Sequence, residues 1–306
     1  MGRQWLSGFA AALALLSAAG CDKAVSACFD EGRVTLPDEQ LVLEAVNNGQ
    51  SGRDIAAAVF AGDIDAVARF ARGDPRLLDT HVPPRAYPEF RPDGQFGDLL
   101  TFAVARCDRQ MVDALLALGA PVNGAVPGAP LDLAIQAGDL DLAEQLLEAG
   151  ASPDPQKAGG TIVPMLTAGR HARPDAARLL IRHGADLGWI DATGTTALQT
   201  IVDMDSMQVA EVLIEAGADP WAVGAGGALP ARGISEPLQL TSKTEEAARQ
   251  RLISRLKRPG VPWPPPDPAT VRRLVTENAW PPVGAREAGL KSAPPEVIAM
   301  LRGTRH

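Results

Sequence analysis

The side chains that could perform acid–base or metal chemistry in this 306-residue chain are few and scattered. The four histidines are His81, His171, His183 and His306. His171 and His183 lie twelve residues apart without a cysteine or a cluster of carboxylates beside them, a spacing that does not match a zinc site. His183 precedes a glycine, where a cation at the end of a helix is favourable for structural reasons. We therefore expect no metal site.

Motifs for nucleophilic or phosphate chemistry are also missing from the sequence. It contains no Gly-x-Ser-x-Gly, no phosphate-binding loop, no His-Glu-x-x-His and no dinucleotide-binding glycine motif after a strand. Acidic residues recur at the expected starts of helices, where they complement the helix dipole, at Asp63, Asp65, Asp139 and Asp141. A catalytic carboxylate pair is the weaker interpretation. The sequence thus predicts a protein without catalytic activity, cofactor or small-molecule substrate.

The first of the three cysteines predicts a lipid anchor. Arg3 is the only charged residue before Asp22, and an apolar stretch followed by small residues separates the two, as in a secretory signal. The run from Ala18 to Cys21 resembles the bacterial lipobox, whose cysteine is lipidated and becomes the mature N-terminus. That motif usually has leucine where this chain has Ala18. The alternative is an ordinary secretory signal with an incidental cysteine.

The lipobox resemblance implies a protein of the bacterial cell envelope. Residues 1–20 would be the signal peptide, and the lipid on Cys21 would hold the body of the protein at a membrane, facing the periplasm. Asp22 favours the inner membrane in enteric bacteria but not in other lineages, so inner and outer membrane both stay open. No later segment reaches the roughly 20 apolar residues that a membrane-spanning helix needs.

The other two cysteines could pair in an oxidising compartment. A Cys28–Cys107 disulfide would hold the N-terminal segment against the rest of the protein. The alternative is that Cys107 is a small buried residue and that Cys28 is free. Both interpretations stay open at this point, because a disulfide requires Cα atoms within about 7 Å of each other.

The elements that carry these residues repeat along the chain. An apolar position recurs at residues 100, 131, 165 and 198, and a Gly-Ala pair begins nineteen residues after each of them. A period near 33 with two apolar stretches per unit is typical of a stacked helical solenoid. Each unit is expected to form a helix, a turn, a second helix ended by glycine, and a protruding loop.

These units resemble ankyrin repeats. Three stretches match the signature of that family: Gly194-Thr-Thr-Ala-Leu198, Leu179-Leu180 and Gly184-Ala-Asp186. Four units match it well, over about 98–227. A fifth unit precedes them, and a sixth is suggested by Leu229-Pro-Ala231, with its second helix late, at about 244–257.

This resemblance implies an all-α, ankyrin-type helical solenoid of about five to six helix-turn-helix repeats, with a role in binding protein. Cys107, Ala172 and Asp205 stand where the glycine between the two helices is expected, and Ile201 stands where alanine is expected. The repeats are therefore divergent, and we expect somewhat irregular packing.

The sequence divides into four predicted segments. They are a signal peptide at 1–20, a tether with a short lead-in helix at 21–50, a repeat array at 51–260, and a Pro-rich linker with a helical cap at 261–306. Short helices at about 269–278 and 295–302 are expected to form a hairpin that caps the array or docks on it. The Pro-rich stretch is interpreted as a stiff linker, with a ligand for another protein as the less favoured alternative.

Interruptions of the repeat supply the candidate partner-binding residues. An inserted loop at 80–97 carries Tyr87, Phe90 and Phe96, and long loops in compact domains are often functional or disordered. Alternatively, these rings cover the exposed end of the first repeat. Trp189 and Trp221 occupy neighbouring places in successive protruding loops, and tryptophan is enriched in binding hot spots. Alternatively, each ring folds back on its own stack.

The charge of the chain narrows the choice of partner. The formal net charge is −8, which disfavours nucleic acid and general attraction to anionic lipid. We therefore expect another protein as partner, bound through the protruding loops and inner helix faces. One hypothesis is an immunity protein that neutralises a toxin delivered to the periplasm. Others are an assembly factor for an envelope complex or a support factor for a periplasmic enzyme.

Overall fold

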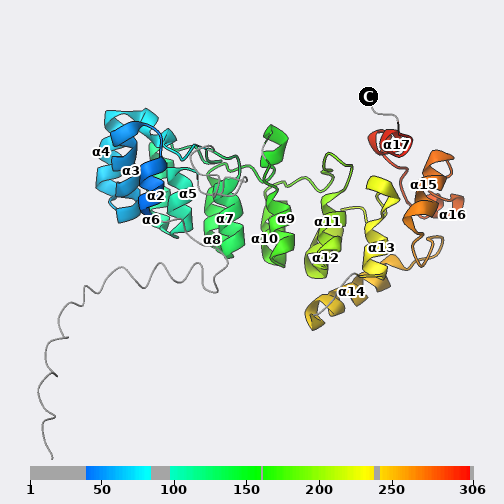
Figure 1. Cartoon of the computed structure of the whole chain (residues 1–306). Helices are drawn as coiled ribbons and strands as arrows, with labels where there is room; N and C mark the ends of the chain where they lie inside the picture. Colours follow the sequence, from blue (N-terminus) through cyan, green and yellow to red (C-terminus); the bar gives the residue numbers. More distant parts are fainter. Residues whose placement is uncertain (1–38, 84–96, 160, 238–241, 304–306) are drawn as a thin grey trace, which may run out of the picture.

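The computed structural model describes residues 39–83, 97–159, 161–237 and 242–303. These residues form sixteen α-helices, α2–α17, and three short 3-10 helices, with no strand beyond isolated bridges. Most of the helices stack in one row, from α2–α4 at one end to α13 and α14 near the other (Figure 1). The fold is the all-α helical solenoid that the sequence predicts.

Six consecutive helix pairs make up the array. A short turn joins the two helices in each of the first five pairs, and a longer loop, which we call a finger, leads from each of the later pairs to the next. The pairs are α3 (Gly49–Ala61) with α4 (Ile64–Gly73), α5 (Leu99–Ala105) with α6 (Arg109–Leu118), α7 (Ala129–Ala137) with α8 (Leu140–Glu148), α9 (Pro164–Arg170) with α10 (Pro174–Arg182), α11 (Ala197–Asp203) with α12 (Met207–Glu215), and α13 (Pro230–Ser235) with α14 (Lys243–Leu256). The 3-10 helices in the loops are η1 (Pro75–Asp79), η2 (Pro155–Ala158) and η3 (Ala225–Gly227).

Further helices flank the array at both ends. α2 (Glu39–Ala45) contacts α3 and buries Val42. After α14 come α15 (Pro268–Thr276), α16 (Val283–Glu287) and α17 (Pro295–Leu301). The sequence predicts α2, α15 and α17 but misses α16, which is only five residues long.

Aspartates begin the second helices of the first three pairs. The side chains of Asp63, Asp108 and Asp139 each accept a hydrogen bond from the backbone N–H three residues further on, at 2.8–3.0 Å. These N–H groups have no partner inside the helix, so each cap stabilises its helix by about 1 kcal/mol. The recurring acidic residues are therefore used for structure, as the spacing predicts.

Left-handed residues make the turns between the two helices of a pair. Gly62 and Gly138 occupy this position with φ of 70° and 80°. Cys107, Ala172 and Asp205 occupy it in the pairs α5–α6, α9–α10 and α11–α12, with φ of 54°, 48° and 56°. A side chain in this region costs about 1–2 kcal/mol relative to the right-handed conformation. The repeat geometry is thus kept even where the sequence lacks the glycine.

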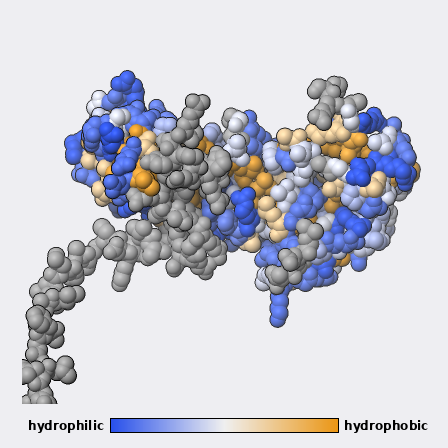
Figure 2. Space-filling view, viewed as in Figure 1, coloured by the Kyte–Doolittle hydropathy of each residue, from blue (hydrophilic) through white to orange (hydrophobic). Residues whose placement is uncertain are grey.

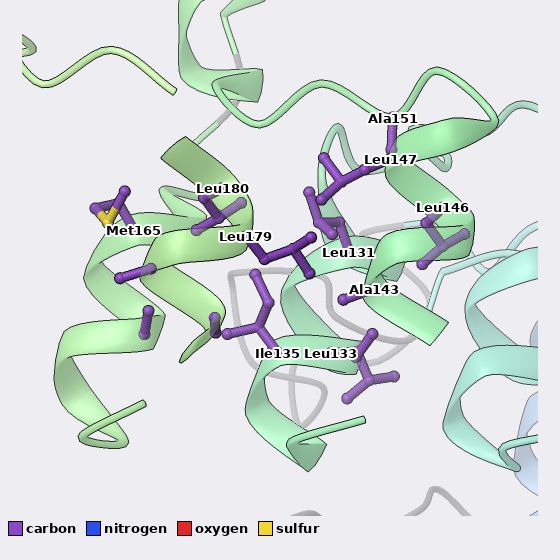
Figure 3. Close-up of a cluster of buried hydrophobic side chains, with 14 of the residues drawn as sticks. Leu131, Leu133, Ile135, Ala143, Leu146, Leu147, Ala151, Met165, Leu179 and Leu180 are labelled. Carbon is purple, nitrogen blue, oxygen red and sulfur yellow. The ribbon is translucent and has the colours of Figure 1, made fainter. Parts of the chain in front are cut away.

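Aliphatic side chains of neighbouring pairs form a continuous core. Figure 3 shows leucines of α7, α8 and α10 converging in the middle of the array, and Leu131, Leu146 and Leu180 are at most 1% exposed. Complete burial of one leucine contributes about 1.5–3 kcal/mol. Towards the N-terminal end, Phe60 and Phe102 stack with ring centroids 5.3 Å apart. Each repeat is therefore stable only when its neighbours cover it.

The C-terminal helices pack on a finger of the array. α15 and α17 contact each other, and both contact η3 in the finger between α12 and α13. The Arg272 guanidinium donates to the Gly226 carbonyl at 2.5 Å, and Arg232 of α13 donates to the Pro265 carbonyl at 2.9 Å. The buried side chains of this small cap include Val271, Val275, Trp280, Leu290 and Val297.

Candidate protein-binding surface

Side chains in one finger hold the backbone of the next finger. The Asn123 side-chain carbonyl accepts from the Ser152 N–H at 2.8 Å, and the Asp154 carboxylate accepts from the Asp186 N–H at 2.9 Å. Lys157 joins Asp154 and Asp186 at 3.5 and 3.0 Å. The three fingers after α6, α8 and α10 therefore form one connected surface. The sequence analysis missed this link, although Asn123 and Asp154 stand 31 residues apart, close to the repeat period.

Asp98 connects the start of α5 to the first finger. Its buried carboxylate accepts from the Thr101 N–H at 2.9 Å, from the Thr101 hydroxyl at 3.0 Å and from the Ala125 N–H at 2.8 Å. Burial raises the pKa of this carboxyl, although the hydrogen bonds act in the opposite direction. Asp98 is a structural anchor whose oxygens are occupied by the protein itself.

The finger between α10 and α11 presents Trp189 on a fixed turn. Asp191 accepts from the N–H groups of Thr193 and Thr195 at 2.8 and 2.9 Å, and an isolated bridge joins Ile190 to Thr196. Burial acts to raise the pKa of Asp191, but its hydrogen bonds outweigh burial and lower it. Trp189 is half-buried. A partly exposed aromatic ring on a rigid support is well suited to anchor a partner.

α17 brings a second exposed apolar side chain to the same finger. A Cβ atom on Gly194, at the tip of the finger, would lie 3.0 Å from the sulfur of Met300, which is 45% exposed. Met300 follows Trp189 by more than a hundred residues, so no local pattern could have joined them. It is a candidate contact that only the docking of the C-terminal helices reveals.

Trp221 does not belong to this surface. It is 2% exposed, and its indole N–H has no hydrogen-bond partner among the described residues. The Ala231 N–H donates to the Pro220 carbonyl at 2.8 Å, which holds this part of the finger against α13, and the ring turns inward. The ring is folded back on the stack, as in the alternative given above, and a role of Trp221 in binding a partner stays a prediction.

Many charged side chains on the second helices and their turns form ion pairs with side chains of the neighbouring repeat. The N–O distances are 2.6, 3.4, 2.6 and 3.6 Å for Arg109–Asp139, Arg182–Glu144, Arg251–Glu211 and Arg255–Glu215. Exposed pairs of this kind contribute at most about 1 kcal/mol each. The first helices, in contrast, leave Arg170 and Asp203 exposed, and Met204, directly after α11, is exposed as well. The fingers and first helices are thus the better candidate surface.

The three aromatic residues of the inserted loop, Tyr87, Phe90 and Phe96, lie outside the described residues. The segments on either side of them meet: the Val82 N–H donates to the Gly97 carbonyl at 2.6 Å, and a bridge joins His81 to Asp98. The two ends of the insertion therefore lie side by side. The partner-binding role of its aromatic residues stays a prediction.

The cysteines are described only in part. Cys107 is disulfide-bonded. Cys21 and Cys28 both lie outside the described residues, so the Cys28–Cys107 pair and the lipid on Cys21 stay predictions.

The histidines occupy structural positions. His171 and His183 are the residues that follow α9 and α10, and the Nδ1 atom of His81 lies 2.7 Å from the Asp79 carbonyl. His306 is outside the described residues. Within the described ranges, no group of three or more His, Cys, Asp or Glu residues could hold a metal ion.

Comparison with known proteins finds one family whose model matches the middle of the array. The family model for ankyrin repeats (three copies) matches residues 131–223, which run from α7 to the finger after α12. No curated protein matches the chain. None of the described helices combines the length and the apolar character needed to cross a membrane. Residues 131–223 of this helical solenoid thus match ankyrin repeats.

Proposed function

We propose that this protein is a lipid-anchored, periplasmic module that binds another protein through its fingers and first helices and has no catalytic activity of its own. The match of residues 131–223 to ankyrin repeats carries this proposal, because such repeats typically act as non-catalytic interaction modules. The hydrogen bonds between fingers support it. A surface that is already ordered loses less conformational entropy when a partner binds.

The charge of the array favours a basic partner. Residues 108–227 contain sixteen acidic and six basic residues, a net charge of −10. Complementary charge speeds association and excludes acidic competitors. An immunity protein that neutralises a basic toxin delivered to the periplasm fits this observation. An assembly or support factor for an envelope complex or periplasmic enzyme is the other proposal, and it requires no basic partner.

A pull-down from detergent-solubilised membranes tests the binding surface. We expect Trp189→Ala, and more strongly Trp189→Ala with Met300→Ala, to reduce partner recovery. Arg72→Ala, an exposed residue of α4 at the other end of the array, is the control and should recover the partner unchanged. Equal recovery with all variants would remove this finger from the proposed surface. Recovery of a basic toxin would favour immunity, and recovery of envelope machinery would favour assembly.

Membrane fractionation tests the anchor. The variant Cys21→Ala cannot carry the lipid, so it should appear in the soluble fraction after membranes are washed with concentrated salt. The unchanged chain should stay in the membrane fraction under the same wash. If the variant stays as well, the lipoprotein proposal is wrong.

A further inference from the structure

Charge is segregated along this molecule. Residues 108–227 carry a net charge of −10, whereas residues 228–303, with twelve basic and seven acidic residues, carry +5. The basic segment begins at the last helix pair and includes the three C-terminal helices, which lie at the end of the row opposite α2 (Figure 1). The net charge of −8 for the whole chain hides a basic end.

The end of α14 and α16 meet at this end of the molecule. A Cβ atom on Gly260 would lie 2.9 Å from the Gly284 carbonyl oxygen and 3.3 Å from the Ala288 Cβ, so the loop after α14 touches α16 directly. We call five residues that lie within three positions of Gly260 or Gly284 the C-terminal tip: Lys257, Arg258, Trp263, Val283 and Arg286. The visible surface at this end of the molecule is largely hydrophilic, with smaller hydrophobic areas (Figure 2).

The tip combines uncompensated cations with exposed apolar groups. Val283 is 77% exposed, the highest value among the large hydrophobic residues that the structure describes. The Lys257 ammonium lies 5.3 Å from the centre of the half-buried Trp263 ring. Lys257, Arg258 and Arg286 are exposed and form no ion pair with any described residue, whereas Arg251 and Arg255, further back on α14, pair with glutamates. One acidic residue of α16, Glu287, is also exposed.

We infer that the C-terminal tip docks on the surface of an anionic phospholipid membrane. Cations near such a surface are attracted without any specific pocket, and an aliphatic and an aromatic side chain beside them can enter the interface. A stable protein partner would need about 800 Å² of complementary surface with a central anchor. A tip with one strongly exposed aliphatic side chain matches a flat, charged surface better.

This docking does not depend on the lipid proposed for Cys21. The tip lies at the opposite end of the row from α2, which follows the N-terminal segment (Figure 1). Together, the two attachments would hold both ends of the array at the membrane. The local cluster also changes the conclusion drawn from net charge alone, which disfavours anionic lipid.

Co-sedimentation with vesicles tests the inference. The protein used is residues 22–306, a cut that removes no helix of the described array and leaves no site for the lipid. We expect it to sediment with vesicles of phosphatidylglycerol and phosphatidylcholine, to stay in solution with phosphatidylcholine alone, and to be released by salt. Arg258→Glu with Arg286→Glu should weaken binding about tenfold or more, and Val283→Asp should weaken it several-fold.

The matched control is Arg69→Glu with Arg72→Glu, which makes the same change of charge on two exposed residues of α4. It should bind anionic vesicles like the unchanged chain. Circular dichroism checks the fold of each variant, and Arg258→Gln with Arg286→Gln replaces the reversed pair if that pair misfolds.

Three results would overturn the inference: no sedimentation with anionic vesicles, equal loss in the α4 control, or a salt-sensitive oligomer that the tip variants disperse without any vesicle binding. The last result would mean that the tip contacts the acidic array of a second copy. None of these results bears on Cys21, whose fractionation test is separate.

Discussion

At the scale of single residues, the turn positions show how firmly the stack imposes its geometry. A glycine with positive φ follows α6, α8, α10 and α12 within two residues, and open space surrounds the place where a Cβ atom would stand at Gly119, Gly150, Gly184 and Gly217. Between the helices of a pair, the same conformation is also held by non-glycine residues such as Ala172. Packing of the helices therefore outweighs the local preference of the residue.

Ala172→Gly should stabilise the protein. Ala172 has φ of 48°, and glycine relieves its strain while increasing the entropy of the unfolded chain, so we expect a gain of up to about 1 kcal/mol. Gly184→Ala is the reciprocal variant, with φ of 84° and no atom near the added Cβ, and should cost about 1 kcal/mol. Urea unfolding measures both, and effects of the same sign would contradict the strain argument.

Asp98→Ala should lower the free energy of unfolding by about 2–4 kcal/mol, because it leaves the buried Thr101 N–H and hydroxyl without their acceptor and also removes the bond to the Ala125 N–H. Burial raises the pKa of Asp98, so the folded chain binds this proton more tightly than the unfolded chain. The stabilisation by Asp98 is therefore largest below the unfolded pKa and falls as the pH rises through the folded pKa.

Urea unfolding of both chains checks this pH dependence. The cost of Asp98→Ala should be larger at about pH 3.5 than at about pH 7. A cost that grows towards neutral pH would show that the hydrogen bonds dominate over burial. Asp139→Ala, which removes a helix cap, serves as a reference with an expected cost of about 1 kcal/mol.

At the scale of helices, two glycines allow α9 and α13 to pack closely against the two sides of α11. A Cβ atom on Gly169 of α9 would lie 2.7 Å from Ile201, and one on Gly233 of α13 would lie 2.5 Å from Val202. Ile201 replaces the small residue expected at that place in the repeat, and Gly169 makes the room that its larger side chain needs. A larger residue in one repeat is thus compensated by a smaller residue in the neighbouring repeat.

Gly169→Ala should destabilise the array by about 1–2 kcal/mol, since the overpacking against Ile201 exceeds the gain in helix propensity. Combining it with Ile201→Ala should restore part of that loss, which a double-mutant cycle measures. Gly73→Ala is the matched control: this glycine lies in α4 with no atom near the added Cβ, and the change should be neutral or stabilising by up to about 1 kcal/mol. Additive effects of Gly169→Ala and Ile201→Ala would contradict direct contact.

Sequence reasoning worked best at this scale. The period near 33 located the helices of the array because amphipathic helices and their glycine ends are local patterns. It placed Trp189 and Trp221 in equivalent fingers and could not separate them. Trp221 is 2% exposed and Trp189 is half-buried, although an equivalent backbone bond ties each finger to the next helix, from Ala197 to Trp189 in one and from Ala231 to Pro220 in the other. The difference in burial is therefore decided by tertiary packing.

At the scale of the whole molecule, the C-terminal cap closes the stack. Its core includes Val271, Trp280 and Val297, and Arg272 fastens it to η3. A solenoid is stabilised mainly by contacts between neighbours, so loss of a terminal unit weakens the nearest repeats first. The cap also supplies Met300 to the candidate surface. Of the C-terminal tip, it contains Trp263, Val283 and Arg286.

A chain ending at residue 258 should lose protection in its last repeats. We expect faster amide hydrogen exchange in α13 and α14, with α5–α8 unchanged, because the removed helices contact η3 and the finger between α10 and α11. Arg272→Ala, which removes one hydrogen bond and keeps the cap, should change exchange only around η3. Uniform loss of protection along the whole array would show that the solenoid unfolds as one cooperative unit.

The sequence by itself determined the solenoid, its repeat length and the structural use of its aspartates, because these depend on residues within one unit. The lipid anchor also stays a prediction from local pattern alone. Only the tertiary structure decided that Trp221 is buried while Trp189 is partly exposed, that Met300 lies at the finger of Trp189, that Gly169 fits Ile201, and that the loop after α14 meets α16 at the C-terminal tip. These features depend on contacts between segments far apart in the chain, whose approach is fixed by packing and leaves no mark in any local pattern.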